Sequence, residues 1–188
     1  MQILQVTTSC QNTIQHCGLF DKFCHILMAV GIPADILTET IVSLGECIRG
    51  NERIQEAFAK VNAPSQPPRP ALILLLLSMV NEKQPFELRC AILYCLQCYM
   101  HKNPTRQCEV MHTLLPNSNS VNSIDEDEVT AGQLLCGGLF ANDSLSAWLS
   151  AVALTHGMIE QDELKAELLK VFFFTTMQCL LLNVFLYW

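Results

Sequence analysis

The sequence predicts an all-α fold in which helices stack as repeats, and three observations support this prediction. Apolar residues recur at three- and four-residue spacing through most of the 188 residues, which is typical of helices with one buried face. No stretch alternates apolar and polar residues convincingly, and no Asn-Gly or Asp-Gly pair marks a tight hairpin turn. Long helices with matching apolar positions return at a period of roughly fifty residues.

The composition indicates a chain that buries most of its surface. Hydrophobic residues make up 51% and charged residues 15%, so disorder is not the expected state. The net charge of −7 and the scattered placement of the 11 Lys and Arg residues argue against nucleic-acid binding, which needs clustered cations. The N-terminus has no basic region and no long apolar core, so we expect no secretory signal and interpret the ten cysteines as reduced thiols of a cytosolic protein.

The helices can be placed in order from their apolar faces and from the residues that stop them. A short polar segment at 8–17 ends at Gly18, and the next helix, 19–30, ends at Gly31 before Pro33. Further helices are expected at 34–49, 54–61, 71–80, 86–100, 108–115, 129–140, 145–158 and 161–171. Turns or loops are expected at 65–70, 81–85, 101–104 and 141–143, and in the last of these Asn142 or Asp143 can act as an N-cap.

The same spacing predicts which side chains are buried. In the helix at 19–30, the apolar residues from Leu19 to Val30 are expected on one inner face. Phe86 and Trp148 are expected in the core. The inner face of the helix at 34–49 is expected to hold Ile36, Leu37, Ile41, Leu44 and Ile48.

Three of the long helices align with one another, each together with the turn and short helix that follow it. The period is longer than the forty-odd residues of armadillo and HEAT units, and the loops at 62–70 and 116–128 account for the excess. The aligned positions are Leu37, Leu88 and Leu145, then Ile41, Ile92 and Leu149, and finally Cys47, Cys98 and Thr155. Stacked units of this kind leave an extended surface, which favours an interaction module over an enzyme.

A group of thiols and imidazoles around Cys95-Leu-Gln-Cys98 resembles a metal or redox motif. Cys90 and His101 flank this pair, and Cys108 and His112 lie beyond it. The pair falls inside an apolar helix rather than in a knuckle or at a helix N-terminus, so we interpret these residues as buried core thiols. Metal binding by Cys90, Cys95, Cys98 and His101 stays the alternative.

Other motifs have simpler interpretations. The five histidines, at 16, 25, 101, 112 and 156, form no His-x-x-x-His pair, and we expect them at the edge of the core or in solvent. Gly137 and Gly138 are expected to allow close helix packing, because no Lys-Ser/Thr follows them as in a phosphate loop. The acids at 125–128 are expected in a solvated, mobile loop before a helix, and a docking point for a basic partner is the alternative.

The last stretch, 171–188, contains no charged residue. Its 18 residues reach the lower limit for a membrane span. Three interpretations stay open: a tail anchor, a helix buried in the stack, and a tail foreign to the fold.

Three stretches resemble the head domain of the Uso-type general vesicular transport factor family, the coiled-coil tethers of the Golgi. They are 31–51 (GIPADILTETIVSLGECIRGN), 62–103 (NAPSQPPRPALILLLLSMVNEKQPFELRCAILYCLQCYMHKN) and 131–154 (AGQLLCGGLFANDSLSAWLSAVAL). The likeness extends over residues 8–171. It implies an armadillo-like α-solenoid that is cytoplasmic and peripheral on Golgi and transport-vesicle membranes.

The resemblance also implies a function and partners. Members of the family dock vesicles before SNARE-mediated fusion in ER-to-Golgi and intra-Golgi transport, and they act with Rab GTPases, SNAREs and Golgi matrix or tethering proteins. No catalytic, cofactor-binding or metal residue is assigned. The family is homodimeric through a rod, but no heptad segment or acidic tail occurs here, so dimerisation is not carried over. We expect a head segment at 1–170, incomplete at both ends, with an acidic loop at 116–128 and a divergent tail at 171–188.

Overall fold

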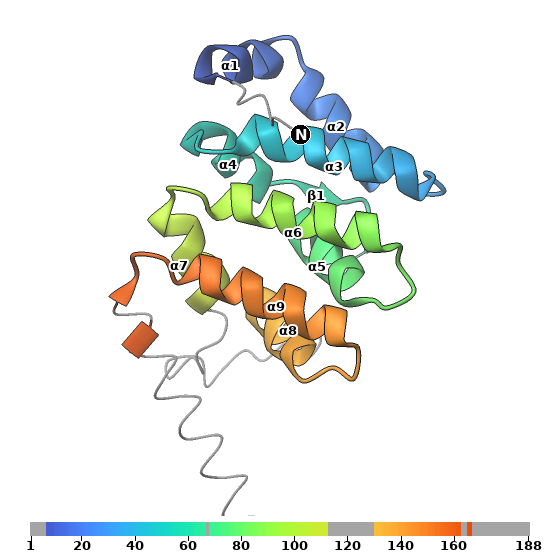
Figure 1. Cartoon of the computed structure of the whole chain (residues 1–188). Helices are drawn as coiled ribbons and strands as arrows, with labels where there is room; N and C mark the ends of the chain where they lie inside the picture. The colour runs from blue at the N-terminus through green and yellow to red at the C-terminus, as the bar shows by residue number, and fades with distance from the viewer. Residues whose placement is uncertain (1–6, 67, 113–129, 163–164, 167–188) are drawn as a thin grey trace, which may run out of the picture.

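The computed structural model describes residues 7–66, 68–112, 130–162 and 165–166, and helices make up nearly all of the regular structure in this part of the chain. They fall into three groups of three that stack along one axis (Figure 1). The first group is α1 (Thr8–His16), α2 (Leu19–Met28) and α3 (Ala34–Ile48). The second is α4 (Glu52–Ala59), α5 (Ala71–Val80) and α6 (Phe86–Met100), and the third is α7 (Pro104–His112), α8 (Ala131–Leu139) and α9 (Ser144–Gly157). The predicted all-α solenoid is confirmed.

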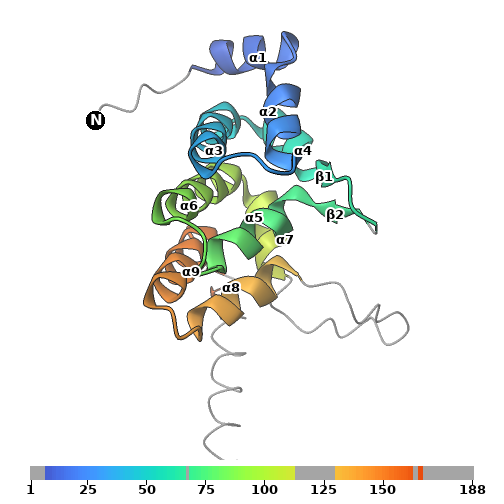
Figure 2. The same cartoon turned by 90° about the vertical axis from the view of Figure 1, so that its right-hand side faces the viewer.

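The third helices of the groups form one layer of the stack. In both views α3, α6 and α9 follow one another along one side, and α6 packs against each of the other two (Figures 1 and 2). Behind each lies the second helix of its own group, because α2 packs on α3, α5 on α6 and α8 on α9. The molecule is therefore a two-layer stack with an outer face on α3, α6 and α9.

The middle helix α6 is the most enclosed of the described helices. Ten of its fifteen residues are buried, because it is covered by α3, α5 and α9 on three sides. The largest side chains with almost no exposure belong to all three groups and form one continuous core. They are Ile41, Leu44, Ile48, Ile54, Phe58, Leu76, Met79, Ile92, Met100, Met111, Leu135 and Leu149.

Buried glutamine amides close the C-terminal ends of α3 and α6. The last carbonyl groups of a helix have no partner inside the helix and need one when they are buried. The amide nitrogen of Gln55, on α4, donates to the carbonyl oxygens of Cys98 at 2.9 Å and His101 at 3.0 Å. The amide nitrogen of Gln11, on α1, donates to two carbonyl oxygens at the end of α3, both at 2.9 Å. Each of these glutamines therefore joins the first helix of its group to the third.

The residue that begins the next group holds each glutamine in place. Asn103 donates from its side-chain nitrogen to Oε1 of Gln55 at 2.8 Å, and its Oδ1 accepts the backbone N–H of Arg106. Asn51 donates in the same way to Gln11, at 3.4 Å, and its Oδ1 accepts a backbone N–H in the first turn of α4. We call this arrangement the cap relay, since one buried set of hydrogen bonds ends one group and starts the next.

The cap relay follows a regular spacing that the sequence interpretation missed. In each group the N-cap of the first helix precedes the buried glutamine by four residues, as Thr7 precedes Gln11, Asn51 precedes Gln55 and Asn103 precedes Gln107. The third copy is completed by Gln161, whose amide nitrogen donates to Oε1 of Gln107 at 3.1 Å. A cap residue and a glutamine at this spacing could have been recognised as a repeat.

The structure also corrects element boundaries. The helix expected at 108–115 begins at Pro104, because Asn103 caps it and proline is well suited to the first helical position; residues 113–115 lie outside the described part. The loop expected at 65–70 includes a two-residue strand, β2 (Arg69–Pro70), which pairs with β1 (Asn62–Ala63) in antiparallel fashion. The helix expected at 161–171 lies largely outside the described residues.

Two predicted inner-face residues are exposed. Val30 is fully exposed, because α2 ends at Met28 and the chain turns at Gly31 in the left-handed region, with φ of 79°. Ile36 is 49% exposed in the first turn of α3, outside the stripe that faces α6. The other apolar residues predicted for the inner face of α3 do pack in or against the core.

The repeat alignment is also displaced. The third helices are confirmed as equivalent, but their N-caps, Pro33, Pro85 and Asp143, pair Leu37 with Arg89 rather than with Leu88. The predicted alignment is one residue out of register at each step. The predicted alignment looked correct because α6 is apolar on most sides. A shift by one residue therefore still places apolar residues opposite apolar residues.

Arg89 joins the second group to the third from inside the core. Its side chain is 3% exposed, and its Nε donates to the carbonyl oxygen of Met79 at 2.7 Å. Its terminal Nη2 lies 2.6 Å from a carboxylate oxygen of Asp143 and 2.6 Å from the hydroxyl of Ser146. Asp143 is the N-cap of α9, as the sequence allowed, so one guanidinium connects the end of α5 to the start of α9.

We predict that Gln55→Leu lowers the free energy of unfolding by about 2–4 kcal/mol, because it leaves buried carbonyl and amide groups without partners. Gln55 is 1% exposed, whereas Gln66 is exposed and gives a matched control, Gln66→Leu, for which little change is expected. Urea denaturation followed by circular dichroism measures both. Equal midpoints for the two variants would show that the cap relay does not stabilise the fold.

The ion pair between Arg89 and Asp143 predicts a pH-dependent stability. The hydroxyl of Ser146, and after it the guanidinium of Arg89, hold the pKa of Asp143 well below its usual range. A carboxyl whose folded-state pKa is depressed stabilises the fold above its unfolded pKa, about 3.9, and loses that contribution as the pH falls below it. Asp143→Asn should therefore be less stable than the natural chain at pH 7, and the difference should shrink below about pH 4.

Urea melts of the natural chain and of Asp143→Asn between pH 3 and pH 7 measure this effect. Asp35→Asn, at an exposed position near the start of α3, serves as the control. A difference between Asp143→Asn and the natural chain that persists unchanged at pH 3 would contradict the assignment.

Candidate interaction surfaces

The outer face of α3, α6 and α9 presents a row of apolar and aromatic side chains. Equivalent positions, counted from the helix starts, place two partly or well exposed side chains of each helix on this face. Trp148 is the largest of them and is 57% exposed, and Val42 is 37% exposed. The row, which we call the outer face, consists of Thr38, Val42, Cys90, Tyr94, Trp148 and Val152. Exposed aromatic side chains are enriched at protein-binding sites.

Tyr94 fixes the centre of the outer face. Its ring covers Gly45 so closely that a Cβ atom there would lie 3.2 Å from the ring carbons. Its hydroxyl donates to the carboxylate of Glu46. Burial, and after it this hydrogen bond, raises the pKa of Tyr94. The aromatic ring is thus held in one place across the junction of α3 and α6, and this part of the face is preorganised for binding.

Phe86 and Trp148 are not core residues, contrary to expectation. Phe86 is 59% exposed and occupies the first position of α6, where its side chain is not covered by a neighbouring helix. Trp148 lies outside the buried stripe of α9, whose members at 146, 149, 150, 153, 154 and 157 follow helical spacing. Aromatic residues in apolar helices are usually assigned to the core. Only the position of Phe86 and Trp148 on their helices, relative to the neighbouring helices, shows that they face solvent.

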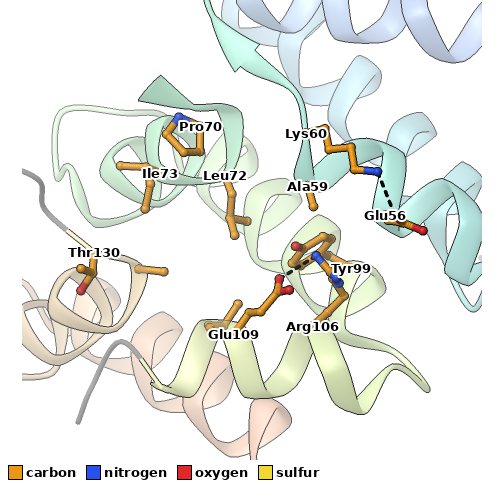
Figure 3. Close-up of a pocket in the computed structure, with 12 residues that line it drawn as sticks. Glu56, Ala59, Lys60, Pro70, Leu72, Ile73, Tyr99, Arg106, Glu109 and Thr130 are labelled. Atoms are coloured by element: carbon orange, nitrogen blue, oxygen red, sulfur yellow. Dashed lines mark hydrogen bonds and ion pairs between the residues drawn. The ribbon is translucent and has the colours of Figure 1, made fainter. Parts of the chain in front are cut away.

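A hollow lies between α4, α5, α7 and α8, and Tyr99 of α6 also lines it. Its volume is about 560 Å³, which is within the range of ligand pockets. Leu72, Ile73 and Val110 make its wall apolar, and Tyr99 and Arg106 lie together in its middle (Figure 3). The charged groups of its rim are already paired, Lys60 with Glu56 at 2.8 Å and Arg106 with Glu109 at 2.6 Å. The arrangement offers apolar contact but no group placed for catalysis.

The thiols that resembled a metal motif do not converge. Cys95 and Cys98 are buried, as predicted, and Cys95 lies near Cys24 and Cys47 of α2 and α3 rather than near Cys90, which is half-buried on the outer face. Burial raises the pKa of Cys98 to about 11. In the described ranges, no three His, Cys, Asp or Glu side chains are arranged to hold a metal ion. The neighbours Cys24 and Cys47 could not be predicted from spacing, since they come from other helices.

The remaining candidate residues have structural roles or lie outside the described part. Gly138 permits close packing of α8 on α9, as predicted, because a Cβ there would lie 2.1 Å from Oγ of Ser150, but Gly137 has open space. His16 and His25 are exposed, whereas burial is the main cause of a lowered pKa for His101 and His156. The side chain of His112 is outside the described residues.

The acidic run at 125–128 and the tail at 171–188 also fall outside the described residues. Within the described residues, no helix has the length and apolar character that a membrane crossing requires.

Comparison with known proteins gives matches along nearly the whole chain. The family described as Uso1 / p115 like vesicle tethering protein, head region, matches residues 51–178, and the Armadillo tether-repeat of vesicular transport factor matches residues 2–36. General vesicular transport factor p115 of Homo sapiens is 56% identical over 165 residues, which are 88% of this chain and 17% of that protein. The proteins of the same name from Bos taurus and Mus musculus match to the same extent. The chain therefore spans about a sixth of the length of these relatives.

We predict that the native protein protects its central thiols from alkylation. Cys10 and Cys17 are exposed and should react with iodoacetamide, whereas Cys24, Cys47, Cys95 and Cys98 are buried and should react only after unfolding. Peptide mass spectrometry before and after denaturation gives the labelling at each position. Rapid labelling of Cys95 in the native protein, or stoichiometric zinc in the purified protein, would overturn the core-thiol interpretation.

Proposed function

Because the chain belongs to the Uso1/p115 family of vesicle-tethering proteins, we propose that it is a protein-interaction module that acts in vesicle docking. The module docks vesicles before SNARE-mediated fusion, in ER-to-Golgi and intra-Golgi transport. The family match over residues 51–178 supports this proposal most directly. The named relatives are much longer than this chain, so their activity as whole proteins comes to it as a proposal.

The outer face provides a surface on which such a module can bind. Trp148 and Tyr94 are the aromatic residues of this face, and aromatic anchors commonly provide a large share of the binding energy at protein interfaces. The two-layer stack keeps the face extended and holds its side chains on rigid helices. The role is binding rather than catalysis.

The partners we propose are Rab GTPases, SNAREs and Golgi matrix or tethering proteins. The place of action is the cytoplasmic surface of Golgi and transport-vesicle membranes, where the protein is peripheral. The resemblance to the family supports these partners and this location.

The outer face gives a direct test of the proposed docking role. The immobilised chain should capture one or more purified Golgi Rab GTPases or SNAREs, and Trp148→Glu should weaken that capture by about tenfold or more. Phe140 is 78% exposed at the end of α8 and is not part of the outer face, so Phe140→Glu is the matched control and should bind normally. Since both positions are exposed, neither change should lower the melting temperature appreciably.

Capture is measured by biolayer interferometry with the GTPases loaded with GTP analogue or GDP. A folded chain that binds none of these factors contradicts the proposed function. Equal loss of binding in both variants contradicts the assignment of the outer face.

A further inference from the structure

We propose that the pocket at the C-terminal ends of α3 and α6 binds an acidic peptide segment through Arg49, His101 and Lys102. This pocket has a volume of about 240 Å³ and is separate from the hollow between α4 and α8. Gln11 and Glu46 also line it. The inference deepens the proposed docking role, on which it rests, by naming the chemistry of one partner.

The positive charges in this pocket are not needed to cap the helices around it. Cations near a helix C-terminus often compensate carbonyl groups that lack donors. Here two carbonyl oxygens at the end of α3 already accept from Gln11, and two at the end of α6 accept from Gln55, at distances of 2.9–3.0 Å. The side chains of Arg49 and Lys102 are therefore left available for another group.

No carboxylate neutralises these charges within the part of the chain that the structure describes. Arg89 and Arg106 each form an ion pair with an acid, but Arg49 and Lys102 form none there. The one acidic side chain in the pocket, Glu46, accepts the hydroxyl of Tyr94. Other unpaired cations are scattered over the surface, whereas these two meet at one hollow together with His101.

His101 is repelled by the two cations that line the pocket with it. Burial is the main cause of the lowered pKa of His101, and the neighbouring charges of Arg49 and Lys102 add to it. A carboxylate bound between these side chains would relieve that repulsion. Arginine offers two parallel donors to a carboxylate, and lysine adds a second positive point nearby. Two acidic side chains of one peptide could thus be held at once.

Lys102 and Glu160 are the two described non-glycine residues with a positive φ, and Lys102 lies in this pocket. Lys102 has φ of 53°, in the left-handed region, at the position that follows the C-cap of α6. Gly50 holds the same position after α3, with φ of 66°. Glycine adopts this conformation without steric cost, whereas a lysine there is strained. The chain therefore places a charge at this pocket at a position where glycine would be the more stable residue.

The overall charge favours a peptide over a membrane as the source of the anion. The chain has a net charge of −7, so an anionic lipid surface would repel most of the molecule. A short acidic segment can reach the pocket without bringing a large field of like charge with it. The attraction between the acidic segment and the cations of the pocket then outweighs the repulsion from the rest of the chain.

Binding of a fluorescent Asp/Glu-rich peptide of about ten residues, measured by anisotropy at low salt, tests the proposal. The double variant Arg49→Gln/Lys102→Gly should bind the peptide at least about tenfold more weakly than the natural chain. The single variant Lys102→Gly relieves backbone strain, so it should fold at least as stably and still bind more weakly. Arg53→Gln/Lys83→Gln removes two exposed cations elsewhere and is the matched control, with binding unchanged.

Three further probes identify the anion: a phosphoserine peptide, inorganic phosphate, and vesicles containing phosphatidylserine. Stronger binding of the acidic peptide than of any of these supports the proposal. Preference for the phosphoserine peptide, for phosphate or for vesicles overturns the choice of ligand. Equal binding of the acidic peptide by the natural chain and by Arg49→Gln/Lys102→Gly overturns the site.

The capture experiment with Golgi factors separates this inference from the proposed function. If the double variant loses acidic-peptide binding but still captures Golgi factors, the pocket and the outer face are two separate binding sites, and both proposals are supported. If the natural chain captures Golgi factors but has no affinity for the acidic peptide, only the proposal for the pocket is overturned. If the folded chain captures no Golgi factor, the docking role is overturned, and so is the proposed role of the pocket in docking.

Discussion

The stack depends on how buried helix ends find hydrogen-bond partners. A solenoid places the C-terminal end of each third helix against the start of the next group, where water cannot reach all of its carbonyl oxygens. The cap relay solves this with a glutamine from the same group and an asparagine from the next one. Apolar packing has no direction and would tolerate some sliding, whereas these bonds fix the spacing between groups. The outer face is regular because its helices end at fixed points.

Polar interactions thus set the geometry of a largely apolar molecule. Arg89 acts like the relay but at the other end of the layer, since it connects the end of α5 with the start of α9. Burying such polar groups stabilises the fold only when every donor and acceptor has a hydrogen-bond partner. Tyr94 completes the arrangement at the surface, where its ring rests on Gly45 and its hydroxyl on Glu46. A single set of constraints therefore positions the outer face and the pocket beside it.

Most of the helices could be predicted from the sequence, and so could the N-cap at Asp143 and the close packing at Gly138. These features depend on local spacing or on one residue type, which a sequence shows directly. The start of α7 could also have been predicted, because Asn103 followed by Pro104 is a strong helix start. The β1–β2 pairing could not have been predicted, since the pairing of two residues around a proline-rich loop leaves no periodic pattern.

The candidate surfaces were harder to predict than the fold. Phe86 and Trp148 read as core residues because their helices are apolar on most sides, and only the partner helices decide which side is covered. The thiol neighbours Cys24, Cys47 and Cys95 come from three helices, so no linear spacing connects them. In tension, the two junctions of the stack should behave differently. Thiols, apolar side chains and the hydrogen bond of Tyr94 with Glu46 hold the first junction, whereas the buried ion pair of Arg89 with Asp143 joins the second, so strong acid should soften the second link by neutralising Asp143.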